Sequence, residues 1–161
     1  MTGSVAVGTA PDPDLADLGS SAPGFLLWRA TLRWQRAAGA ALDPLGLTHA
    51  QFALLAGVWF LGRSSGPPTQ RELADHVGTE ARMTSQVVQV LAANGLVTRG
   101  PDPADGRVRR LGVTRAGDEL ARRALGAILE VERAFFAATP PEAGLLAVLR
   151  PLAGLGGDVS S

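Results

Sequence analysis

The sequence predicts a mainly α-helical protein with a small β-hairpin, and three observations indicate this fold class. Most of the 161 residues lie in segments whose apolar residues recur at the 3.6-residue period of a helix. Most of these segments begin with a capping side chain, and several end at a glycine. Two short segments with β-branched residues, 96–100 and 107–113, flank a turn rich in Pro, Asp and Gly. These two segments are the expected strands.

The composition is that of a folded protein of one domain, with or without terminal arms. Hydrophobic residues make up 46% and charged residues 19% of the chain, which suffices for a packed core. The absence of cysteine excludes disulfides and thiolate zinc sites. No run of 18 or more apolar residues is present, and the N-terminus lacks the basic and apolar regions of a secretion signal. We therefore expect a cytoplasmic protein.

The N-terminal part is expected to contain a flexible tail and two helices. Residues 1–23 form the tail, which is mostly polar. The stretch FLLWRATLRWQRAAGAAL (25–42) places apolar residues at helical spacing with arginines between them. A capping box of Thr48 and Gln51 then opens a second helix, and Gly62 is well placed to end it.

A short helix, a third helix and the hairpin follow. A second capping box, Thr69 with Glu72, opens the short helix, and Gly78 ends it. The next helix is expected over about residues 80–94, with Gly95 at its C-terminal end. A helix–turn–helix that continues directly into a β-hairpin is the arrangement of a winged helix. The hairpin is then the wing.

Two further helices complete the chain. Thr114 opens a long helix over 115–138, and the stretch TPPE (139–142) caps a final helix over 143–155. The helices at both ends of the chain have broad apolar faces, which favour dimerisation; a larger monomeric core is the alternative. The expected organisation is a flexible tail (1–23), N-terminal helices (24–63), a winged helix–turn–helix region (64–115), C-terminal dimerisation helices (116–155) and a second flexible tail (156–161).

The helix over 80–94 has a polar face that suits base recognition. Four residues on it recur at helical spacing, and none is a carboxylate, which would repel phosphate. They are Arg82, Ser85, Gln86 and Gln89. Arginine matches the acceptors of guanine in the major groove, and glutamine matches the acceptor–donor pair of adenine. The alternative is an ordinary solvent-facing helix. The opposite face is expected to point to the core and consists of Met83, Val87, Val90, Leu91 and Asn94.

The expected wing carries a local excess of positive charge. Residues 82–115 include six arginines and two aspartates, although the net charge of the whole chain is zero. Asp105 is expected to accept hydrogen bonds from the turn. The start of the short helix, at Thr69 and Gln70, offers backbone N–H groups to a phosphate. The alternative is a solvated hairpin whose charges prevent aggregation. The basic residues of the wing are Arg107, Arg109 and Arg110, and arginine is favoured in narrow minor grooves.

The segments LTHAQFALLAGV, TQRELADHVG and MTSQVVQVLAANGLVTRGPDPADGRVRRLGVTRAGDEL resemble the MarR family of bacterial transcription regulators. The resemblance spans about residues 25–155, and its most specific part is NGLVTR followed by the wing signature DPADGRVRRLGVT. It implies a homodimer that binds double-stranded DNA sequence-specifically. We expect a repressor of a pseudo-palindromic operator, with half-sites about one DNA turn apart.

The resemblance also assigns roles to individual residues. It implies that Asp105 orients the wing, that Arg107 enters the minor groove, and that residues 83–86 read bases and grip phosphates. The chain departs from the common pattern at Gln86, Gln89, Val90 and Gly106, where many members carry charged residues. The full set expected at the DNA is Thr69, Gln70, Arg82, Met83, Thr84, Ser85, Gln86, Gln89, Arg107, Arg109 and Arg110.

A further implication of the resemblance is a small aromatic or phenolic effector that releases the protein from DNA. Aromatic residues and arginines on the first two helices are the candidates to bind it, and ordinary core packing is the alternative for each aromatic ring. The expected ligand-binding residues are Trp28, Arg29, His49, Phe52 and Trp59.

No catalytic function is expected. The chain has two histidines and neither cysteine nor tyrosine, and it contains no phosphate loop, dinucleotide fingerprint or nucleophile elbow. We expect no cofactor, no metal and no membrane partner. The alternative function is a winged-helix module that uses its arginine wing to bind an acidic protein, without specific DNA binding.

Overall fold

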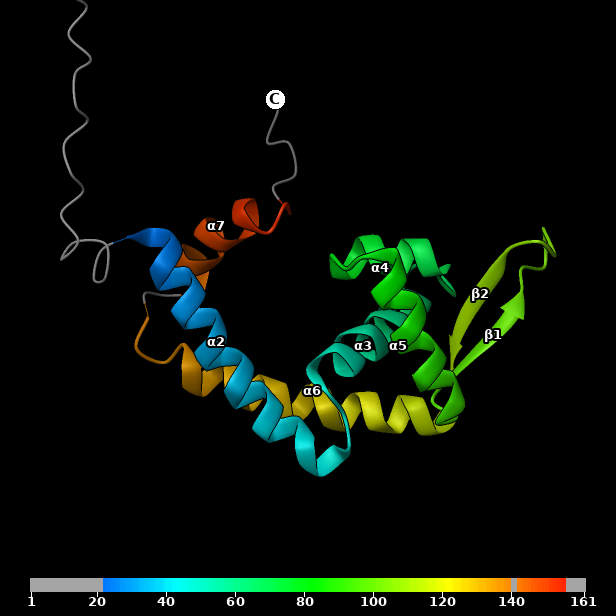
Figure 1. Ribbon diagram of the computed structural model, residues 1–161, viewed down its shortest axis with the longest axis horizontal. Helices are drawn as coiled ribbons and strands as arrows, with labels where there is room; N and C mark the ends of the chain where they lie inside the picture. Colours follow the sequence, from blue (N-terminus) through cyan, green and yellow to red (C-terminus); the bar gives the residue numbers. More distant parts are fainter. Residues whose placement is uncertain (1–21, 140–141, 156–161) are drawn as a thin grey trace, which may run out of the picture. The chain divides into compact units, whose positions relative to one another are not determined.

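The computed structural model describes residues 22–139 and 142–155, and it confirms the predicted fold class. The order of elements is helix, helix, short helix, helix, hairpin, long helix, helix (Figure 1). Contacts divide the described residues into two compact units, with the boundary between Arg36 and Ala37. The elements are α2 (Pro23–Leu42), the 3-10 helix η1 (Asp43–Leu45), α3 (His49–Ser64), α4 (Gln70–Val77), α5 (Ala81–Ala93), β1 (Val97–Pro101), β2 (Arg109–Val113), α6 (Arg115–Phe135) and α7 (Glu142–Leu152).

The described part of the first unit is the N-terminal portion of α2, which exposes apolar side chains. Leu26, Leu27 and Trp28 are about half exposed. The Phe25 and Trp28 rings lie 5.9 Å apart, and the Arg29 guanidinium lies 5.8 Å from the Phe25 ring centre. Much of the apolar surface of this helix is therefore uncovered.

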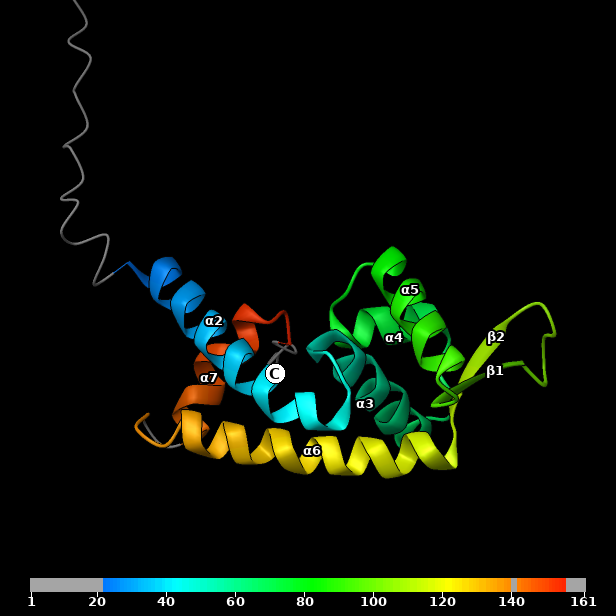
Figure 2. The same cartoon turned by 60° about the horizontal axis from the view of Figure 1, so that its bottom comes forward.

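The core of the second unit is built around α3. Leu54, Leu55 and Val58 of this helix are fully or almost fully buried. The helix packs against α4, α5, α6 and β2. Figure 2 shows α3 between α6 on one side and α4 with α5 on the other. Because α3 contacts all of these elements, its apolar faces determine where the helix–turn–helix and the hairpin are held.

The predicted helix ends near Gly78 and Gly95 are confirmed, but the one at Gly62 is wrong, and α6 and α7 end at Phe135 and Leu152 rather than at residues 138 and 155. Both capping boxes are present, and Gly78 and Gly95 have positive φ angles. Helix α3, however, continues past Gly62 to Ser64. Gly66 takes the positive φ of 97°, and its N–H donates to the Leu61 carbonyl at 3.0 Å. A glycine inside a helix is tolerated, so its presence alone did not locate the end.

The hairpin is shorter than predicted on its second strand. Val97 pairs with Val113 and Pro101 pairs with Arg109 in an antiparallel register. The second strand begins at Arg109 rather than at residue 107. The N–H groups of Arg107 and Val108 instead donate to the side chain and the carbonyl of Asp105, at 3.0 and 2.9 Å. These two residues therefore belong to the turn.

The C-terminal helices also leave apolar surface uncovered. Ala121, Ala124 and Ile128 of α6 are buried, whereas Leu129 is 48% exposed, and Val148 and Leu152 of α7 are more than 60% exposed. The predicted cap at 139–142 and the predicted tails lie largely outside the described residues. No single helix in the described ranges is long and apolar enough to span a bilayer; residues 23–45 and 49–64 meet those criteria only when taken together.

The start of α6 packs tightly against Gly95 and Leu96, which follow α5, and Gly117 makes this approach possible. The Thr114 hydroxyl accepts from the Gly117 N–H at 3.0 Å and donates to the Gly95 carbonyl at 2.7 Å. A Cβ atom on Gly117 would lie only 2.0 Å from the Leu96 carbonyl oxygen. Any larger side chain at this position must displace backbone.

We expect Gly117→Ala to lower the free energy of unfolding by about 3 kcal/mol or more, because the added methyl group overlaps backbone atoms. Gly126→Ala is the matched control on the same helix, since a Cβ there meets no atom within 4 Å. It should raise stability by about 0.5–1 kcal/mol through helix propensity. Urea denaturation measures both, and equal stabilities for the two variants would contradict the tight approach.

Candidate DNA-binding surface

Helix α5 presents the predicted polar stripe to solvent. Its N-terminal residue Ala81 follows Glu80, which has a β-region backbone but makes no side-chain capping bond. The stripe residues Arg82, Ser85, Gln86 and Gln89 are all exposed. Their donors and acceptors are therefore accessible from one side of the helix, as recognition of base edges requires.

The buried face of α5 differs from the predicted one, and Thr84 is the reason. Thr84, Val88 and Leu91 are fully buried. The Thr84 hydroxyl lies 2.8 Å from the Thr79 hydroxyl and donates to the Glu80 carbonyl at 3.0 Å. Because this polar side chain is satisfied internally, it can occupy the core.

Because the buried face of α5 is not the predicted one, the predicted places of several of its residues are wrong. Thr84 was expected at the DNA, but its side chain has no exposed surface. Met83 and Val90 were expected in the core, but they are 39% and 43% exposed, and Asn94 is exposed at the end of the helix. Met83 was also predicted at the DNA, and its exposure is compatible with that second prediction.

At the start of α4, the capping box occupies part of the predicted phosphate site. The Thr69 N–H donates to the Glu72 carboxylate at 2.7 Å, and the Glu72 N–H donates to the Thr69 hydroxyl at 3.2 Å. The Thr69 N–H is therefore committed to the protein. The N–H groups of Gln70 and Arg71 belong to the first turn, where no helical carbonyl precedes them. The predicted phosphate contact remains a prediction for the Gln70 N–H.

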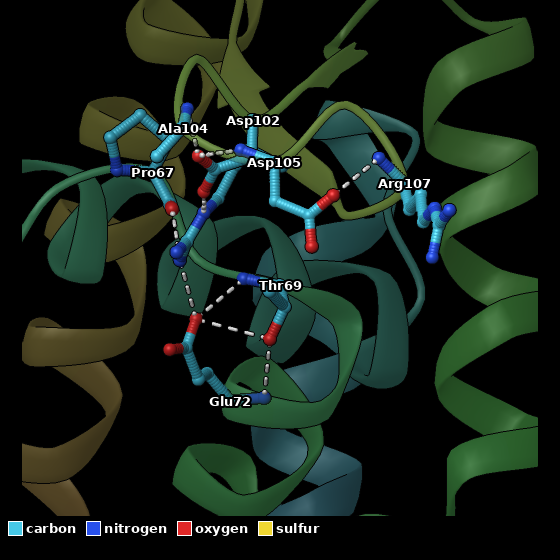
Figure 3. Close-up of polar contacts among 8 residues, drawn as sticks. Pro67, Thr69, Glu72, Asp102, Ala104, Asp105 and Arg107 are labelled. Carbon is cyan, nitrogen blue, oxygen red and sulfur yellow. Dashed lines mark hydrogen bonds and ion pairs between the residues drawn. The ribbon is translucent and has the colours of Figure 1, made fainter.

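The turn of the wing is organised by two aspartates. The Asp102 carboxylate accepts from the Ala104 N–H at 2.7 Å and from the Asp105 N–H at 3.3 Å. The Asp105 carboxylate in turn accepts from the Arg107 N–H, so the predicted hydrogen bond from the turn is present (Figure 3). In that view the Arg107 side chain extends away from Asp102.

Arg110 joins the wing to α4 and does not extend into solvent as the sequence analysis assumed. Its Nε donates to the second Asp102 oxygen at 2.5 Å. Its Nη1 donates to the Glu72 carboxylate at 3.0 Å and to the Pro67 carbonyl at 3.2 Å. The Arg110 side chain is only one-third exposed. Neither Glu72 nor Asp102 was predicted as a partner of Arg110; Asp102 lies eight residues before it in the sequence, and Glu72 lies 38 residues before it.

These contacts perturb the ionisation of both carboxyl groups. The hydrogen bond from Arg110, followed by that from the Ala104 N–H, holds the pKa of Asp102 below its ordinary value. The Thr69 N–H does the same for the pKa of Glu72, with Arg110 contributing. Both groups are therefore negatively charged at neutral pH, and both attract Arg110.

Four arginines on α5 and the hairpin remain accessible. Arg82, Arg99, Arg107 and Arg109 are exposed, and none forms an ion pair with a carboxylate in the part of the chain that the structure describes. Figure 1 shows the hairpin projecting beyond the C-terminal end of α5. A helix with a polar stripe and a protruding basic hairpin thus belong to one unit.

This geometry agrees with the comparisons to known proteins. The MarR family model matches residues 45–108, from η1 to the turn of the wing. The HTH-type transcriptional regulator YdcH of Bacillus subtilis is 38% identical over 133 residues, which cover 83% of this chain and 90% of that protein. The chain belongs to the MarR family of DNA-binding transcriptional regulators. The HTH-type transcriptional repressor Rv2887 of Mycobacterium tuberculosis is 34% identical over 108 residues, 66% of this chain and 75% of that protein.

Solved structures of the family have the same fold. CouR from Rhodococcus jostii RHA1, bound to p-coumaroyl-CoA, superposes with a TM-score of 0.76 at 24% identity, covering 88% of this chain and 97% of that one. CouR bound to a 23-mer DNA duplex superposes with a TM-score of 0.71, covering 89% of this chain and 98% of that one. At 24% identity, this likeness concerns the fold.

The expected effector-binding residues of this family member are divided between the two units. Trp28 and Arg29 belong to the first unit. In the second, the His49 and Phe52 rings lie 6.5 Å apart. Phe52 is 8% exposed, and partial burial lowers the pKa of His49. Their part in binding a ligand remains a prediction.

Trp59 has a structural partner that the sequence analysis missed. Its indole N–H donates to the Asp118 carboxylate of α6 at 2.7 Å. Arg63 and Arg122 form ion pairs with the same carboxylate and lie 4.7 and 5.7 Å from the Trp59 ring centre. The polar edge of Trp59 is thus committed to the contact between α3 and α6, which weakens its candidacy as a ligand-binding residue.

We expect Asp102→Asn to lower the melting temperature at pH 7, because asparagine keeps an acceptor for the turn but loses the ion pair with Arg110. A carboxylate with a lowered pKa contributes stability that is fully present above its unfolded pKa of about 3.9 and is lost as the pH falls through the lower folded value. The difference from wild type should therefore be constant from pH 8 to about 5 and shrink below about pH 4. Thermal melts measure it, and a difference that persists unchanged into acid would contradict the ion pair.

Proposed function

We propose that the protein is a homodimeric repressor that binds a pseudo-palindromic operator, with α5 in the major groove and the wing in the adjacent minor groove. The observation that carries this proposal is the combination of an exposed polar stripe on α5 with exposed arginines on a projecting hairpin. Such a regulator acts on the chromosome, so we place it in the cytoplasm.

The stripe on α5 suits direct readout. Arg82 can donate to guanine, and Gln86 and Gln89 can both donate to and accept from adenine. A carboxylate is absent from the stripe, so phosphate groups can approach it without repulsion. The exposure of Ser85 supports an additional backbone or base contact.

The wing suits the minor groove. Arg107 follows the Asp105 turn, and its side chain extends away from the carboxylates that hold Arg110. The negative potential of a narrow minor groove attracts such an arginine. Arg109 is also exposed and can reach the phosphate backbone.

Exposed apolar residues at both ends of the chain support the homodimer. Leu26 and Trp28 of α2 and Val148 and Leu152 of α7 are between 46% and 67% exposed. Exposed large apolar side chains on each of these helices are typical of protein interfaces. A two-fold dimer would place two α5 helices in successive major grooves, about 10 base pairs apart.

Related proteins support the repressor and effector parts of the proposal. Rv2887 is named a transcriptional repressor, and CouR was solved both on DNA and with p-coumaroyl-CoA. We therefore propose that a small aromatic compound releases this protein from its operator. The candidates to bind it are Trp28, Arg29, His49 and Phe52, with Trp59 the weakest.

The alternative is a winged-helix module that binds an acidic protein. Neutralising several phosphates makes affinity fall steeply with salt, whereas a packed protein interface is much less sensitive. Binding of the purified protein to DNA from upstream of its own gene, measured at several salt concentrations with competitor DNA, separates the two functions. Saturable, competitor-resistant and salt-sensitive binding is expected; absence of specific binding at low salt would favour the protein partner.

We expect Arg107→Ala to weaken binding to every DNA sequence and to lower the slope of log affinity against log salt by about 1, because one contact to the wall of the minor groove is lost. Arg123→Ala on α6 removes an exposed arginine away from the hairpin and is the matched control. Fluorescence anisotropy at several salt concentrations measures both variants. An unchanged affinity for Arg107→Ala would exclude a wing contact through this residue.

Gln86→Ala should act differently, by changing the preference among operators. The loss should amount to about 1–3 kcal/mol at one base pair, because a bidentate contact to a base is removed. Competition between operator variants with single base-pair changes measures this effect. If the loss were uniform across all variants, Gln86 would only position the protein on the backbone.

A further inference from the structure

We infer that Arg110 and Asp102 position the wing from the start of α4, and that Arg110 is not itself a DNA contact. This inference rests on the proposed DNA-binding function and adds two residues that set how the wing is presented. Their contacts link Glu72 on α4 to Arg110, then to Asp102, and through the turn to Arg107 (Figure 3).

The donors of Arg110 are engaged within the protein. Its Nε and Nη1 atoms make three hydrogen bonds, to Asp102, Glu72 and Pro67. Two of these are ion pairs with carboxylates, and hydrogen bonds between ionised groups are among the stronger ones in proteins. Moving the guanidinium to a phosphate would break these bonds and leave two carboxylates facing the DNA. Arg110 is therefore retained by the protein.

The two oxygens of Asp102 bind different parts of the wing. One oxygen accepts the N–H groups of Ala104 and Asp105, and the other accepts Arg110. The side chain is only 12% exposed. A single carboxylate thus fixes the turn and attaches it to the arginine. The direction in which the turn presents Arg107 depends on this attachment.

The backbone of β2 is also held at the segment that precedes α4. The Leu111 N–H donates to the Pro68 carbonyl at 2.7 Å, and Thr69 forms a bridge with Arg110. The backbone of β2 therefore already contacts the segment that precedes α4. Arg110 lies at this junction and extends the connection from the base of the hairpin to its turn.

A purely electrostatic role of Asp102 and a positioning role predict opposite effects of Asp102→Asn on DNA affinity. Asp102→Asn removes a negative charge close to the DNA-binding surface, so a purely electrostatic effect would strengthen binding. The asparagine oxygen still accepts from the turn, but the attachment to Arg110 is lost. We expect binding of the upstream fragment to weaken about threefold to tenfold, because the wing contact is partly forfeited.

Asp75→Asn is the matched control, since Asp75 is an exposed carboxylate on α4 outside these contacts. Its affinity for DNA should be unchanged or tighter. Combining Asp102→Asn with Arg107→Ala gives a second readout. If Asp102 acts through the wing, the double variant binds about as weakly as Arg107→Ala alone. If the two losses multiply, Asp102 does not act through Arg107, and the inference is overturned.

Arg110→Met supplies an independent variant that keeps the aliphatic stem, and circular dichroism checks the folding of each protein. In the Arg107→Ala background, Arg110→Met should leave the salt slope unchanged; a further fall of about 1 would reveal a direct phosphate contact and overturn the inference. The inference is also overturned if the wild type binds DNA specifically and Asp102→Asn binds it equally or more tightly. Failure of the wild type to bind DNA specifically would instead reject the proposed function.

Discussion

The hairpin depends on the segment that precedes α4, because a two-stranded ribbon has little stability of its own in water. Leu111 anchors β2 twice: its side chain is buried in the core, and its N–H donates to Pro68. The capping box of Thr69 and Glu72 begins α4 at the same place. One short segment therefore starts the helix–turn–helix and supports the wing, so the two parts of the DNA-binding surface have a common base.

The remaining surface follows from the core around α3. Leu73 of α4, Val88 and Leu91 of α5, and Leu111 of β2 all enter this core. Their burial leaves Gln86 and Gln89 facing solvent on α5. Because the same core holds both α5 and the base of the wing, the packing around α3 fixes the spacing between the polar stripe and the arginines of the hairpin.

Local signals predicted the helix starts and most of the fold. The capping boxes at Thr48 and Thr69 and the glycines at 78 and 95 act within a few residues of chain, so the sequence contains all that is needed to recognise them. The error on the buried face of α5 arose from local hydrogen bonds of a polar side chain. Thr84 is buried because Thr79 and Glu80 satisfy it, which a helical pattern of apolar residues cannot express.

The outline of the DNA-binding surface was also predictable from local patterns. The stripe on α5 and the Asp105 turn are local patterns, and both are present. The role of Arg110 depends on Glu72, which lies 38 residues earlier in the chain. From the sequence alone, Arg110 was predicted to be one of the basic residues of the wing that contact DNA. Its pairing became visible only with the fold, and the same is true of Trp59 with Asp118.

Hydroxyl-radical footprinting of the wild-type protein on the upstream fragment tests the central claim most directly. The account predicts two protected blocks related by two-fold symmetry, with centres about 10 base pairs apart. Protection of the minor groove by the wings should flank them. A single unsymmetrical block, or protection without any contribution from the minor groove, would contradict the dimeric arrangement of α5 and wing.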